Sequence, residues 1–241
     1  MRRLLYKPIK YERCVIGFRN TYDNHRCISS FSRIFNAPSI LKTSGKSMRT
    51  FIALELPQTF CIETEALANQ LSTTVQGRFL KQDTYHLTLA FLGEIDEATA
   101  QKVIGILNAT FDKFCANFPS CQSGIALNAV GLGKFGKSND STLFLEIQLT
   151  KALSALSTTL HEELKAQGIH FDQKKFRPHI TLARRANLSK GSLKNLAFPA
   201  PDTATKLTFF KSTLTPKGAL YKPLYTVDLK IKHFPNSRGN A

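Results

Sequence analysis

Two short segments of this chain repeat the same pattern, and each has the length and flanking residues of a half-buried strand. The first is Tyr85–Leu89 and the second is Pro178–Leu182, and in both a histidine is followed two positions later by a threonine. Successive side chains of a strand point to opposite faces, so the histidine and the threonine share one face while the apolar residues face the core. The repeat therefore predicts two strands that each present an imidazole beside a hydroxyl.

The four polar side chains of the repeat are His86, Thr88, His179 and Thr181. A single histidine on a strand is usually a structural residue, but two copies with matching apolar flanks favour a functional site. Imidazoles with pKa values of about 6.5 can hold opposite protonation states near neutral pH, as a general acid and a general base must. If the two segments are related by a pseudo-twofold axis, the pairs face each other across a cleft.

Hydrophobic periodicity and turn residues predict alternating strands and helices with several hairpins. We expect a second strand that Gly93 ends, a helix capped by Asp96 that ends near 111, and a helix capped by Thr150 that ends at Gly168. The other expected strands are 50–56, 123–131, 142–149, 177–184, 205–214 and 221–230, and the other expected helices are 58–74 and 189–195. This order favours an α+β fold, with two lobes and internal pseudo-symmetry.

Positive charge is concentrated at the start of the chain. The formal net charge is +16, and residues 1–47 hold ten of the 33 Lys and Arg but only two acids. We interpret 1–47 as an extension outside the fold, and 48–241 as the folded domain. The extension is a targeting segment, a tail that touches nucleic acid, or translated upstream sequence with Met48 as the working start, which is the interpretation we favour. A basic chain of this kind favours a polyanionic partner.

Several classes of protein are disfavoured by composition. No apolar run approaches the ~18 residues of a membrane span, so we expect no membrane insertion. The five cysteines form no C-x-x-C pair, which argues against a disulfide framework and a zinc site and favours reduced thiols in a cytoplasmic protein.

One segment matches the phosphate-loop pattern of nucleotide-binding proteins. Gly131–Ser138 satisfies G-x-x-x-x-G-K-[ST], but such a loop must lead directly into a helix whose amides hold the phosphates. The residues that follow, 142–149, alternate in the manner of a strand. We therefore expect a glycine-rich hairpin here, and a nucleotidase remains a minor alternative.

The paired motifs resemble those of the two-histidine phosphoesterase superfamily, and most closely its LigT-like RNA 2′,3′-cyclic phosphodiesterases. The resemblance covers about 48–230, and it rests on 49–57, His86–Gly93, 130–135 and Phe176–Arg184. It implies a bilobal α+β fold and metal-independent hydrolysis of a 2′,3′-cyclic phosphate on RNA ends, leaving a 2′-phosphate. Some members of the family also join RNA ends reversibly through 2′–5′ linkages.

The resemblance also implies roles for individual residues. His86 takes the place of the proton donor and His179 that of the proton acceptor, and no cofactor is required. Thr88 and Thr181 can donate hydrogen bonds to the non-bridging phosphate oxygens. Arg184, three residues after Thr181, is a candidate for a bidentate phosphate contact, against the alternative of a solvated strand-end arginine.

Two other functions stay open at this point. The chain could be a basic RNA-binding module that does not turn over its ligand, or the phosphate-loop nucleotidase described above. We expect a monomer in the cytoplasm. The remaining histidines, His25, His161, His170 and His233, are expected to lie outside the site, with His161 on the polar side of its helix.

Overall fold

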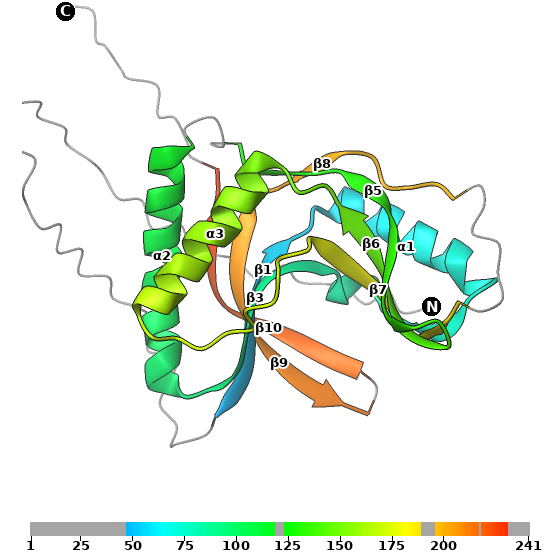
Figure 1. The fold of residues 1–241 in the computed structure, drawn as a ribbon, viewed down its shortest axis with the longest axis horizontal. Coiled ribbons are helices and arrows are strands. Elements are labelled where there is room, and N and C mark those ends of the chain that lie inside the picture. The colour runs from blue at the N-terminus through cyan, green and yellow to red at the C-terminus, as the bar shows by residue number, and fades with distance from the viewer. Residues whose placement is uncertain (1–46, 119–122, 189–195, 217, 231–241) are drawn as a thin grey trace, which may run out of the picture. The chain divides into compact units, whose positions relative to one another are not determined.

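The computed structural model describes residues 47–118, 123–188, 196–216 and 218–230. The basic extension up to residue 46 and the short helix expected at 189–195 therefore lie outside the described residues. Within the described part, the strands and helices build two antiparallel sheets with helices packed against them (Figure 1).

The first four-stranded sheet has the order β10-β9-β1-β3. Its strands are β1 (Met48–Glu55), β3 (His86–Ile95), β9 (Lys206–Thr215) and β10 (Gly218–Asp228). All neighbours are antiparallel, and β3, which carries the first His-x-Thr motif, forms an edge of this sheet.

The second four-stranded sheet has the order β2-β7-β6-β5. Its strands are β2 (Gln76–Phe79), β5 (Ala129–Lys137), β6 (Asp140–Ile147) and β7 (His179–Asn187). The second motif lies on β7, and β3 and β7 contact each other. A small pair, β4 (Ile125–Leu127) with β8 (Asp202–Ala204), completes the described strands.

Among the described residues, three α-helices cover the sheets: α1 (Gln58–Ser72), α2 (Glu97–Asn117) and α3 (Lys151–Ala166). Helices α2 and α3 pack on each other and against strands of the first sheet, whereas α1 contacts β2 of the second (Figure 1). The Asp96 carboxylate accepts from the Thr99 amide at 2.8 Å, and the Thr150 hydroxyl oxygen accepts from the Leu153 amide at 3.2 Å. Both predicted N-caps are therefore confirmed.

Apart from 189–195, the expected elements are found with shifted ends, but the single strand expected at 123–131 is divided into β4 and β5, which belong to different sheets. The short strands β2 and β8 were not expected. Strand β2 has the sequence Gln-Gly-Arg-Phe with mostly exposed residues, so no apolar alternation marks it; its pairing with β7 makes it a strand. The expectation that Gly93 ends a strand is wrong. Gly93 has φ 72° and sits where the β1–β3 register shifts, so it forms an irregularity through which β3 continues to Ile95.

The apolar faces of both sheets join one core. The buried cluster includes Leu54 and Leu87 from the first sheet, Leu145 and Ile180 from the second, and Leu107 from α2. This shared core holds β3 and β7 in fixed relation, and so fixes the two motifs that begin them. No helix in the described ranges has the length and apolarity needed to cross a bilayer.

Candidate active site

His86 is the first residue of β3 and directly follows the short 3₁₀ turn η1 (Gln82–Thr84) and Tyr85. Its Nδ1 lies 2.8 Å from the carbonyl oxygen of Thr84. A carbonyl oxygen can only accept, so Nδ1 carries the proton of the neutral ring and donates it to this bond. The bond fixes the ring and leaves Nε2 as the atom available for proton transfer.

His179 has the same arrangement at the start of β7. Its Nδ1 lies 2.7 Å from the carbonyl oxygen of Arg177, again two residues upstream. In register, His86 pairs with Glu55 of β1 and His179 pairs with Glu146 of β6. The two motifs therefore share one local construction, in which Nδ1 is held by the backbone and Nε2 is left for chemistry.

Aromatic rings orient both imidazoles. The His86 ring centroid lies 4.7 Å from that of Phe51 and 5.1 Å from that of Tyr221. The His179 centroid lies 5.0 Å from that of Phe135 and 5.1 Å from that of Phe144. Each imidazole is thus packed against two aromatic neighbours, which restrict its rotation and remove water from around it.

Gly133 makes room for one of these rings. It faces Phe144 across the β5–β6 pair, and a Cβ at Gly133 would lie 2.3 Å from atoms of the Phe144 ring. Phe144 is fully buried, so its ring has no free space into which to retreat. Gly133 therefore serves the packing behind His179. The segment is a β-hairpin as predicted, and β5 leads into β6 rather than into a helix.

Burial and positive neighbours lower the pKa of both histidines. The pKa of His86 is lowered to about 4, mainly by burial and further by the charges of His179 and Arg184, although the bond to Thr84 acts in the opposite direction. Burial also lowers the pKa of His179, together with Arg177 and Arg184. The charge of one imidazole thus acts on the other, and Arg184 acts on both.

The two threonines and Arg184 lie beside the histidines on their strands. Thr88 and Thr181 are half-buried on the same strand face as His86 and His179, between fully buried neighbours such as Leu87 and Ile180. Neither hydroxyl bonds another protein group in the described part of the chain. Both hydroxyls are therefore available to a ligand.

A cleft of about 780 Å³ opens in front of His86. Its lining includes Thr88 and Arg184 as well as Phe51 and Tyr221, so strands of both sheets contribute to it. His179 does not line this cavity directly, but it acts electrostatically on His86. Of the predicted site residues, His86, Thr88 and Arg184 share the cleft, and His179 and Thr181 lie on the same strand as Arg184.

Arg177 is held away from the cleft by its own contacts. Its Nη2 lies 3.1 Å from Glu146 Oε1, and its guanidinium carbon lies 5.0 Å above the Phe144 ring. Its side chain is nevertheless exposed. In the structure it covers the aromatic layer behind His179, where its charge contributes to lowering the pKa of that ring.

The other described histidines take no part in the site. His161 Nε2 lies 2.8 Å from the carbonyl oxygen of Leu89, and the ring packs 4.6 Å from that of Phe171. The expectation of a polar helix face is therefore wrong for His161, which joins α3 to β3. His170 is exposed, and His25 and His233 lie outside the described residues.

Sequence reasoning missed the aromatic residues and Arg78. Phe51 and Tyr221 are distant from His86 in the sequence, and only the β1–β3 pairing and the fold of β10 bring them to it. Arg78 lies on β2, a strand without a sequence signal. In the described residues, no three His, Cys, Asp or Glu side chains gather as metal ligands would.

Comparison with known proteins places this arrangement in a family. Residues 64–211 match the model of the 2′-5′ RNA ligase superfamily. The RNA 2′,3′-cyclic phosphodiesterase of Thermotoga maritima is 31% identical over 184 residues, which cover 74% of this chain and 94% of that protein. The Escherichia coli protein of the same name is 27% identical over 188 residues, which cover 75% of this chain and 96% of that protein.

Solved structures show the same fold. E. coli LigT complexed with 3′-AMP superposes on this chain with a TM-score of 0.58 and a sequence identity of 23%. The superposition covers 77% of this chain and 100% of the LigT chain. A Thermus thermophilus protein superposes with a TM-score of 0.58 and a sequence identity of 22%, and the superposition covers 77% of this chain and 100% of that protein. The predicted bilobal, LigT-like two-histidine α+β fold is thus confirmed.

Proposed function

Because this chain belongs to the 2′-5′ RNA ligase superfamily, we propose that it is an enzyme that hydrolyses 2′,3′-cyclic phosphates at RNA 3′ ends to 2′-phosphates. Several relatives that it matches over most of its length are named RNA 2′,3′-cyclic phosphodiesterase. The observation that carries the proposal is the matched pair of histidines, each with Nδ1 held by a backbone carbonyl and Nε2 left open.

The reaction needs one proton removed and one supplied. His179 Nε2 takes a proton from a water molecule as the water oxygen bonds to phosphorus, and the bond between phosphorus and O3′ breaks. His86, protonated at Nε2, gives its proton to O3′ as that oxygen leaves. The products are a 2′-phosphate and a 3′-hydroxyl, and exchange with solvent restores both rings.

The hydroxyls and the arginine stabilise the charge on phosphate. Thr88 and Thr181 donate hydrogen bonds to the non-bridging oxygens, where negative charge accumulates during the displacement. Arg184 supplies a guanidinium to the same oxygens, and it lines the cleft beside His86 and Thr88. These are the roles that the paired motifs predict, and the orientation of the two rings supports them.

Neither proton transfer requires a metal ion, so the reaction is proposed to be metal-independent. A 5′-hydroxyl of a second RNA in place of water would use the same acid and base and would form a 2′–5′ linkage, so reversible ligation is part of the proposal. Residues 48–241 are proposed as the catalytic domain of a monomer. The buried Cys61 thiol is consistent with a reducing, cytoplasmic location.

The test uses the full-length chain and an RNA oligonucleotide that ends in a 2′,3′-cyclic phosphate, in the presence of EDTA. We expect turnover to a 2′-phosphate, and a loss of kcat of about 10²–10⁴-fold in His86→Gln and in His179→Gln. His170→Gln changes an exposed histidine and serves as the matched control. RNA binding without turnover would replace the proposal with a binding module, and activity that EDTA abolishes would contradict metal independence.

A further inference from the structure

Strand β7 contains an extra residue immediately after Arg184. Gln76 and Arg78 of β2 are two positions apart, but their partners on β7, Asn187 and Arg184, are three positions apart. The pairing of β7 with β6 has the same extra residue: Ser141 and Leu143 are two positions apart, whereas their partners Ala186 and Ala183 are three positions apart. The residue common to both irregularities is Arg185, so it is the bulged residue.

Arg185 has the backbone conformation of such a bulge. Its φ is 53°, and it is the one non-glycine residue with positive φ among those described. A left-handed conformation costs a residue with a side chain about 1–2 kcal/mol, and bulges redirect side chains. In a regular strand Arg184 and Arg185 would point to opposite faces, whereas here both are exposed and line the same pocket.

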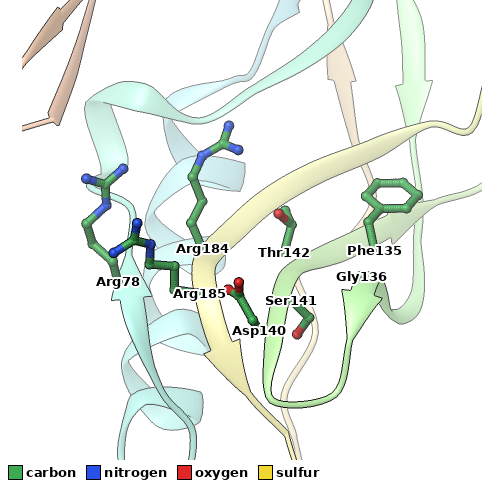
Figure 2. A pocket seen from close by; sticks show the side chains of 8 residues that line it. All are labelled: Arg78, Phe135, Gly136, Asp140, Ser141, Thr142, Arg184 and Arg185. Atoms are coloured by element: carbon green, nitrogen blue, oxygen red, sulfur yellow. The ribbon is translucent and has the colours of Figure 1, made fainter.

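That pocket has a volume of about 640 Å³ and lies beside the β5–β6 hairpin. Figure 2 shows three arginines around it, Arg78 from β2 and Arg184 and Arg185 from β7, together with Asp140. Asp140 is the single acidic residue of the lining. The pocket therefore carries a net positive charge.

Within the described part of the chain, the arginines of this pocket form no ion pair. Arg78 and Arg184 are moreover direct cross-strand partners, an arrangement in which like charges repel. An anion bound between them would relieve this repulsion and accept hydrogen bonds from several guanidinium groups.

The pocket adjoins the cleft of the candidate active site, with which it shares two lining residues. Arg78 and Arg184 line both cavities, whereas Arg185 lines only the pocket. Phe135, whose ring contacts His179, also lines the pocket and is 41% exposed. A polyanion whose end lies at His86 thus has a second cationic site along its path.

We propose that this pocket binds a backbone phosphate of the RNA upstream of the cyclic end, an inference that rests on the proposed function. Arg185, which the bulge turns to this side of β7, and Arg78 supply the guanidinium groups of the pocket, while Arg184 beside them is assigned to the cyclic phosphate. A cyclic mononucleotide has no such phosphate and occupies the cleft alone. The enzyme therefore selects oligonucleotide ends over cyclic mononucleotides.

The test compares two substrates in the full-length chain: a short RNA ending in a 2′,3′-cyclic phosphate and a 2′,3′-cyclic mononucleotide. Arg185→Gly removes the guanidinium and places glycine at a φ that glycine adopts freely, so the fold is kept. We expect the oligonucleotide-to-mononucleotide ratio of kcat/KM to fall about tenfold. Lys102→Ala removes an exposed charge on α2, outside both cavities, and should leave the ratio unchanged.

A binding measurement separates this proposal from the proposed function. We use RNA with a 2′-phosphate end and follow fluorescence anisotropy over a range of salt concentrations. Arg185→Gly should weaken binding and reduce the slope of log K against log salt by about 1. Wild-type protein that opens neither substrate would contradict the proposed function alone, and a variant with unchanged substrate ratio, affinity and salt slope would overturn the phosphate site alone.

Discussion

At the scale of single residues, the candidate site depends on how tightly the imidazoles are held. Each ring is fixed by one backbone carbonyl and two aromatic neighbours. General acid–base catalysis requires the proton-carrying atom within hydrogen-bond reach of the reacting oxygen, so small displacements are costly. We therefore expect residues that touch no substrate, such as Gly133, to act on catalysis through the rings.

Gly133→Ala tests this dependence. The new Cβ would lie 2.3 Å from the Phe144 ring, which is buried and contacts His179, so the ring must shift and disturb that contact. We expect kcat to fall at least tenfold, and the free energy of unfolding to fall by about 1–3 kcal/mol, the usual cost of overpacking. Gly131→Ala on the same strand, where a Cβ meets nothing within 4 Å, is the matched control. Equal kcat values for the two variants would show that Phe144 does not position His179.

At the scale of the strand and helix, irregular positions define where side chains point. Gly93 in β3 and Arg185 in β7 both have positive φ, and each lies at a register shift in its sheet. The two motif-bearing strands are thus both bulged toward their C-terminal ends. Periodicity alone predicts a strand end or a regular alternation at these positions.

Two glycine substitutions with opposite expected effects on the free energy of unfolding test the role of Gly93. Gly93→Ala places a Cβ on a residue with φ 72°, so we expect a loss of stability of about 1–2 kcal/mol. Gly105→Ala lies within α2, where a Cβ meets nothing within 4 Å, and we expect a gain of about 0.5–1 kcal/mol. Urea denaturation measures both. A Gly93 variant as stable as the wild type would mean that β3 tolerates a regular strand there.

At the scale of the whole described domain, the candidate active site lies where two sheets meet. Each sheet contributes one histidine, and their shared core keeps β3 and β7 in contact. The same burial, together with Arg184 of β7, lowers the pKa of both rings. In the free protein at pH 7 both imidazoles are therefore mostly neutral, and binding of an anionic substrate raises the pKa of His86.

The pH dependence of the rate follows from these pKa values. The proposed mechanism needs His86 protonated and His179 neutral, so kcat/KM, which reports the free enzyme, should be bell-shaped with its maximum below pH 6.5. Above that maximum it should fall about tenfold per pH unit. The optimum of kcat should lie at higher pH, because bound phosphate favours the charged imidazole. A profile that is flat from pH 5 to 9 would remove the two-imidazole mechanism.

The sequence alone determined the elements and the chemical groups. Alternating polarity around His86 and His179 placed them on half-buried strands, and the caps Asp96 and Thr150 were readable from residue type. These features depend on neighbours within one turn or one strand, so they are encoded locally. Strand β2 has no such signal, because its pairing partner lies far away in the chain.

Only the tertiary structure decided what surrounds the histidines and where the charges gather. Phe51, Tyr221 and Phe144 reach the rings through strand pairing, and their burial sets the direction of the pKa shifts. Arg78 and Arg185 meet because β2 pairs with a bulged β7. Register and burial are properties of contacts between distant segments, which residue types and their spacing along the chain do not specify.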